Sequence, residues 1–145
     1  MKKTLIIFLL ITACGYQPIN IKKDIIFFDN VEFIGEKKIN REISSIFPIK
    51  KEYNNLEKKE VIVESTKNII ETSKNTKGQV STFRTEISSK ITILVNQKIL
   101  KEKLFEKSFS YNNLDNKFDL KNYQKSIENN LIDEIIEEIA IFISM

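Results

Sequence analysis

Few side chains of this sequence could carry out catalytic chemistry. The 145 residues include no histidine, which removes the commonest general base, and only one cysteine, Cys14. Zinc-ligand spacing, a glycine-rich phosphate loop and a nucleophile elbow are all missing from the sequence. The adjacent carboxylates Glu137 and Glu138 would point in different directions on a helix, as on a solvated surface. We therefore predict a protein that is not an enzyme and that uses no metal and no cofactor.

The surroundings of Cys14 give its thiol a different chemistry, because a single cysteine cannot form an internal disulfide. Two lysines open the chain, the apolar run Leu5–Ala13 follows, and the small residues Thr12 and Ala13 precede the cysteine. This arrangement resembles a bacterial lipobox, in which a peptidase cuts before the cysteine and the thiol carries diacylglycerol. Ile11 stands where the motif prefers leucine. We predict that Cys14 is lipidated.

The apolar run has to be compared with a transmembrane anchor. Leu5–Ala13 holds nine residues, about 13 Å of helix at about 1.5 Å per residue. A bilayer core is about 30 Å thick and needs around 20 apolar residues to cross. The run is too short, so residues 1–13 are predicted to be a cleavable signal peptide. An ordinary secretory cleavage that leaves Cys14 in a folded core is the remaining alternative.

The residue after the predicted lipidation site bears on the destination of the chain. In double-membraned bacteria an aspartate at this place typically retains lipoproteins in the inner membrane, whereas this chain has Gly15. We expect an outer-membrane protein that faces the periplasm and is held by its acyl chains, palmitate among them. A mature bacterial lipoprotein typically carries three such chains, which suffice for stable anchoring where one alone binds marginally.

The charge of the mature chain is nearly balanced. The full sequence carries +3, and cleavage before Cys14 removes two lysines, which leaves +1. This balance argues against a general nucleic-acid binder, which needs a concentrated basic face. The charge is uneven, however, at +5 over residues 50–107 and −4 over residues 108–145. Either an ordinary sheet and helix attract each other, or the basic part forms a surface for an anionic ligand.

The first half of the body alternates between strand and helix patterns. β-branched and aromatic residues mark Ile25–Phe33 as a strand that Gly35 closes. An amphipathic helix is expected next, ended by Pro48, and a strand over Glu60–Thr66 follows it. The alternation becomes irregular at Lys67–Ile70, where we expect a bulge. The helix is predicted from apolar residues at three- and four-residue spacing, namely Ile39, Ile43, Ile46 and Phe47.

The second half contains the clearest patterns. Lys74–Gly78 predicts a turn, and Phe83–Val95 alternates with period two, as in a long half-buried antiparallel strand. Asn96–Lys98 is the expected hairpin tip, and the return strand ends with Phe105–Tyr111. A helix from about Leu120 to Phe142 carries a wide apolar stripe opposite an acidic face.

The order of these elements is strand, helix, three strands, helix. It predicts an α+β fold of two layers, in which two helices lie on one face of a four-stranded, mostly antiparallel sheet. The other face of the sheet should be open and comparatively polar. This single domain would occupy residues 24–145, after a lipidated tether over residues 14–23.

The lipobox and the element order together resemble the LptE family of LPS-assembly lipoproteins, in its alphaproteobacterial type. The mature chain would begin Cys-Gly-Tyr-Gln-Pro-Ile over Cys14–Ile19, close to the Cys-Gly-aromatic-x-Pro pattern of that type. The likeness covers most of the mature chain. The other segments that carry it are the turn at Lys77–Gln79, the strand through Phe83–Ile87, the hairpin into Phe105–Tyr111 and the C-terminal helix.

The resemblance implies a fold of two helices on a four-stranded sheet, and it also implies a role. LptE proteins sit in the lumen of the LPS-inserting β-barrel LptD, help it to fold, plug it and contact LPS. The partners to expect are LptD, lipopolysaccharide and the membrane. Lysines suit the anionic phosphates of lipid A as point charges. The candidate contacts are Lys74 and Lys77 at a loop tip and Lys121 near a helix start.

Two other functions remain open from the sequence. The chain could be a ligand-binding lipoprotein that delivers a solute or a lipid to a transporter. It could also be a structural lipoprotein of another envelope machine, such as the complex that inserts β-barrels. Ligand that copurifies without a barrel would favour the first alternative, and the identity of a bound barrel would decide the second.

Overall fold

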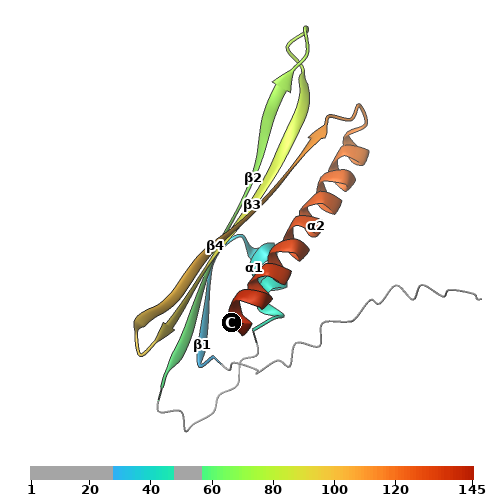
Figure 1. Cartoon of the computed structure of the whole chain (residues 1–145). Coiled ribbons are helices and arrows are strands. Elements are labelled where there is room, and N and C mark those ends of the chain that lie inside the picture. Colours follow the sequence, from blue (N-terminus) through green and yellow to red (C-terminus); the bar gives the residue numbers. More distant parts are fainter. Residues whose placement is uncertain (1–27, 48–56) are drawn as a thin grey trace, which may run out of the picture.

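A four-stranded sheet forms one layer of the molecule and two helices form the other, as the computed structural model shows (Figure 1). The structure describes residues 28–47 and 57–145. Its elements in chain order are β1 (Asn30–Gly35), α1 (Lys37–Ser44), β2 (Lys59–Lys74), β3 (Val80–Val95), β4 (Lys98–Asn112) and α2 (Lys117–Ser144).

The strands lie in the order β1-β2-β3-β4. β1 runs parallel to β2, because α1 carries the chain back to the starting end of the sheet between them. β2, β3 and β4 pair antiparallel through two hairpins. Helix α1 contacts β1 and β2, helix α2 contacts β3 and β4, and the helices touch each other. The predicted fold class, a mostly antiparallel sheet with both helices on one face, is confirmed.

The alternation in β3 decides which face of the sheet is buried. Ile87 and Ile91 on the helix side are almost completely buried, whereas Arg84 on the opposite side is exposed. Helix α2 closes the core with its apolar stripe, whose buried members are Leu120, Ile127, Leu131, Ile132, Ile135 and Ile139. The helix begins three residues earlier than predicted, because the side chain of Asn116 caps it by accepting a hydrogen bond from the backbone N–H of Phe118 (2.9 Å).

The predicted first strand, Ile25–Phe33, agrees with the structure only in part. The structure puts β1 at Asn30–Gly35, where parallel pairing with β2 runs from Asn30 to Gly35; residues 24–27 of the predicted domain lie outside the described part. Phe28 is fully buried, but it packs edge-to-face on Phe47 at a ring distance of 5.7 Å. Its burial explains why the apolar pattern starts earlier than the strand ladder.

The first helix and the predicted bulge also need correction. Helix α1 ends at Ser44, and the chain continues through Phe47 in tight turns with hydrogen bonds between residues three apart. β2 pairs regularly with β3 through Lys67–Ile70, and the irregular register lies further on, between Glu71 and Lys74. The alternation lapses after Lys67 because neither face of the strand is buried there.

The exit from β1 is the most constrained point of the backbone. Gly35 has a φ of 94°, in the left-handed region, and a side chain there would overlap the carbonyl oxygen of Ser65. That oxygen accepts a hydrogen bond from the backbone N–H of Glu36 (3.1 Å). The hydroxyl of Ser65 donates to Asn40 Oδ1 (2.7 Å), and Asn40 Nδ2 donates to the carbonyl of Ile34 (3.1 Å). These bonds hold α1 on the sheet.

Ion pairs join the basic sheet to the acidic helix. Lys107 of β4 pairs with Glu134 and Glu138 of α2. The hydrogen bond from Lys107 holds the pKa of the Glu138 carboxyl below its usual value. Lys67 of β2 and Lys38 of α1 both reach Glu128, at 3.1 Å and 3.2 Å. These ion pairs therefore account for part of the uneven distribution of charge along the sequence.

Candidate functional site

The predicted lipidation site lies outside the described residues. Cys14, the signal peptide over residues 1–13 and the tether over residues 14–23 belong to the part of the chain that the structure leaves undescribed. Their processing and lipidation remain predictions. Within the described residues, neither helix combines the length and the apolar character needed to cross a bilayer.

The tip of the β2–β3 hairpin displays two of the three predicted lysines. Asn75 organises the turn, since its Oδ1 accepts hydrogen bonds from the backbone N–H groups of Lys77 (2.9 Å) and Gln79 (3.0 Å). Gly78 takes a φ of 78°, as the turn requires. Lys74 and Lys77 are both exposed, and Lys74 Nζ lies 4.0 Å from a carboxylate oxygen of Glu71.

A polar hollow lies at the root of this tip, between the hairpin and the loop that leads into α2. Its volume is about 550 Å³. Lys117 lines it together with the carboxylates Glu71 and Asp115, and none of the three predicted lysines does. The exposed Lys121 lies four residues further along α2 than Lys117. Sequence reasoning missed Lys117, whose place directly after the helix-capping Asn116 was its signal.

The floor of this region is aromatic. Phe83, which lines the hollow, stacks on Tyr111 at a centroid distance of 5.9 Å. Tyr111 meets Tyr123 of α2 edge-to-face at 5.8 Å, and its hydroxyl pairs with that of Thr85 at 3.1 Å. Asn113 also lines the hollow, and its side-chain oxygen is buried and has no hydrogen-bond partner in the described residues. The end of the molecule that carries the β2–β3 tip therefore combines exposed lysines with packed aromatic side chains.

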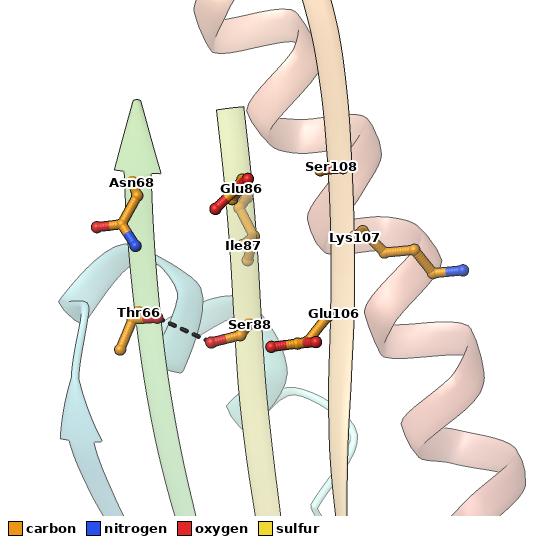
Figure 2. A pocket seen from close by; sticks show the side chains of 8 residues that line it. All are labelled: Thr66, Asn68, Glu86, Ile87, Ser88, Glu106, Lys107 and Ser108. Atoms are coloured by element: carbon orange, nitrogen blue, oxygen red, sulfur yellow. Dashed lines mark hydrogen bonds between the residues drawn. The ribbon is translucent and has the colours of Figure 1, made fainter. Parts of the chain in front are cut away.

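The face of the sheet away from the helices is open and polar, as the sequence predicted. A hollow of about 250 Å³ lies on it, and Thr66 and Ser88, which share a hydrogen bond of 2.8 Å, are among the lining residues labelled in Figure 2. Glu86 and Glu106 line the same hollow. No group of three metal-ligating side chains occurs within residues 28–47 and 57–145. The hollow thus offers hydrogen-bonding groups on the open face of the sheet.

These features define a class of protein: a two-layer α+β domain with a parallel first strand pair, two antiparallel hairpins and both helices on one face. Solved bacterial lipoproteins have the same fold. Rare lipoprotein B from Shewanella oneidensis is 12% identical, with a TM-score of 0.53 over 78% of this chain and 95% of that one. Uncharacterized lipoprotein B from Nitrosomonas europaea, also 12% identical, has a TM-score of 0.62 over 81% and 83%.

A minor lipoprotein from Acinetobacter baumannii is similar as well, at 15% identity, with a TM-score of 0.55 over 81% of this chain and 91% of that one. No family model matches the sequence, and no curated protein matches it. At these identities the likeness establishes the fold. The lipobox-like segment that ends at Cys14 remains a prediction from the sequence.

Proposed function

We propose that this protein is an outer-membrane lipoprotein of the LptE type, which partners and plugs the LPS-translocating β-barrel LptD and assists lipopolysaccharide assembly. The observation that carries the proposal is the coincidence of a lipobox at Cys14 with the fold of rare lipoprotein B, an LptE-type protein. The alphaproteobacterial assignment remains a prediction from Cys14–Ile19.

The dimensions of the sheet suit a plug. β3 has 16 residues, which span about 50 Å at about 3.3 Å per residue. The hydrocarbon core of a bilayer is about 30 Å thick. A body of this length that is anchored in the inner leaflet could extend through the lumen of a surrounding barrel. Its far end, the tip that bears Lys74 and Lys77, would then lie near the outer leaflet.

The surface chemistry of the sheet also suits a lumen. Barrel lumens are polar, and the open face presents hydroxyls and cross-strand ion pairs rather than a continuous apolar surface. Lys90 pairs with Glu102 at 3.2 Å, and Arg84 Nε donates to the hydroxyl of Ser110 at 3.2 Å. Such groups can exchange water for polar lumen side chains with little loss of free energy.

Lys74, Lys77 and Lys121 are proposed to contact the phosphates of lipid A, and their reversal to glutamate tests this part of the proposal. We expect the triple variant to bind purified LPS at least about tenfold more weakly, a change of about 1.4 kcal/mol. The matched control is the reversal of three other exposed lysines, Lys37, Lys58 and Lys125. It changes the net charge equally and should change the LPS dissociation constant less than about twofold. Equal weakening in both variants would contradict a site at the tip.

A further inference from the structure

The tip of the β3–β4 hairpin, at the other end of the sheet, is apolar where the β2–β3 tip is polar (Figure 1). Ile99 and Leu100 follow the tight turn at Asn96 and Gln97, and their exposed fractions are 61% and 64%. Two neighbouring aliphatic side chains exposed at a hairpin tip lose free energy in water for no gain in folding. Together they offer an apolar contact surface at this tip.

A register shift in the ladder produces this exposure. Leu94 pairs with Ile99 and Ile93 pairs with Lys101, so that Leu100 has no residue opposite it. The end of α2 lies close by, because Lys101 Nζ donates a hydrogen bond of 2.7 Å to the carbonyl of Phe142. Another exposed aliphatic side chain, Ile141, precedes that carbonyl. The apolar tip and the helix end therefore form one end of the molecule.

Charged side chains precede and follow the two aliphatic residues in the chain. Lys98 and Lys103 are exposed, and Lys103 Nζ lies 4.9 Å from the ring centroid of Phe105, while Lys101 is held against α2 and Glu102 pairs with Lys90. Lysine stems can lie along an apolar surface while their ammonium groups reach anionic head groups. Each lysine close to an anionic bilayer adds to the attraction between the protein and the membrane. Aliphatic residues flanked by lysines fit the boundary between head groups and acyl chains better than they fit a protein pocket.

The start of β1 lies at this same end of the sheet. The backbone N–H of Asp29 donates to Lys59 (2.8 Å), and that of Asn96 donates to Lys58 (2.9 Å), so the start of β1 and the hairpin tip flank the same turn of chain. The chain from Cys14 to Phe28 can span at most roughly 50 Å. A lipid on Cys14 would thus keep the start of β1 within roughly this distance of the membrane.

We propose that the β3–β4 tip is a second membrane contact, in which Ile99 and Leu100 insert into the surface of an anionic bilayer between the head groups of lipids bound by Lys98 and Lys103. The proposal rests on the lipid anchor of the proposed function, but it requires neither the barrel nor LPS. The lipid alone would leave the body free to rotate on its tether. Two contacts would fix its orientation and direct the β2–β3 tip away from the inner leaflet.

The chain lacks tryptophan, so a single Leu100→Trp substitution gives a site-specific reporter of membrane insertion. The full-length protein would be purified from membranes in detergent and reconstituted into vesicles of phosphatidylethanolamine and phosphatidylglycerol. Some vesicles would carry bromine on the acyl chains, which quenches tryptophan on contact. We expect at least twofold lower emission from Leu100→Trp in brominated vesicles than in plain ones.

The matched control is Ile70→Trp, at a β2 position that is also exposed, with a fraction of 42%, but lies towards the polar end. Its emission should be equal in the two kinds of vesicle, although its own lipid holds it to them equally well. Equal emission from Leu100→Trp as well would overturn the proposal, and would instead point to a protein partner at the tip. Because the vesicles hold no barrel, failure here leaves the proposed function standing.

The lysines are tested in the same reporter chain. Reversal of Lys98 and Lys103 to glutamate should reduce the quenching by at least half in vesicles that contain phosphatidylglycerol. Replacing phosphatidylglycerol by phosphatidylcholine should likewise reduce the quenching of the Leu100→Trp protein that keeps Lys98 and Lys103. Quenching that is insensitive to both changes would contradict the assignment of these lysines to anionic head groups.

Discussion

Replacing Gly35 by alanine should lower the free energy of unfolding by at least about 3 kcal/mol. A left-handed φ alone costs a residue with a side chain about 1–2 kcal/mol, and Gly35 has a φ of 94°. The added Cβ would also overlap the carbonyl oxygen of Ser65, a backbone atom that can move only with β2. Moving it would break its hydrogen bond to Glu36 and disturb the buried pair of Ser65 and Asn40.

Gly78 provides the control for this prediction. It has a similar φ of 78°, but a Cβ added there meets nothing within 4 Å. Gly78→Ala should therefore show the conformational cost alone, about 1 kcal/mol. Urea unfolding followed by circular dichroism measures both values. Equal losses in the two variants would mean that β1 and β2 do not approach as closely as described.

Replacing Cys14 by serine should abolish lipid attachment completely, because the chain has no second thiol. Cells grown with labelled palmitate should incorporate the label into the wild-type protein and none into the variant. The variant should also keep residues 1–13, since cleavage in a lipobox follows lipidation. Mass spectrometry would show the retained residues 1–13 as additional mass in the variant.

Gly15→Asp separates lipidation from sorting in the same experiment. This variant should incorporate as much palmitate as the wild type, but it should fractionate with the inner membrane. Label that persists in Cys14→Ser would show that the acyl chains are attached elsewhere. A wild-type chain without label would remove the lipoprotein assignment and would support ordinary secretory cleavage.

The elements that could be predicted from the sequence are those in which buried residues recur at a regular spacing within one segment. The four-residue spacing of Ile127, Leu131, Ile135 and Ile139 specifies α2, because each of these side chains is buried against the sheet. The alternation of β3 likewise reports one face under the helices and one open face. The turn at Asn96 and Gln97 follows from the strand pattern on either side of it.

The features that could not be predicted depend on pairing between distant segments. β2 continues past Thr66 because β3 supplies hydrogen bonds, not because its side chains are buried. Gly35 ends β1, but only the position of Ser65 shows why no larger residue fits. The exposure of Leu100 depends on a register shift between β3 and β4 that the sequence does not encode in any local pattern.

The candidate site also has one part that could be predicted from the sequence and one part that could not. The exposure of Lys74 and Lys77 could be predicted, since a turn signal surrounds them. The sequence places Lys121 near a helix start, but the structure puts Lys117 at the hollow between the hairpin and α2. Which lysine lies there depends on where the cap at Asn116 begins the helix, and helix boundaries are set by a single side-chain hydrogen bond.

The central claim is that the protein is the partner of an LPS-exporting barrel. The most direct test is to extract the tagged protein from host membranes in mild detergent and to identify by mass spectrometry what comes with it. We predict an LptD-like outer-membrane β-barrel in near-equal amount, because a plug inside a barrel should survive mild detergent. A different barrel would place the protein in another envelope complex. A chain that emerges alone would contradict the proposed function and favour a ligand-binding lipoprotein.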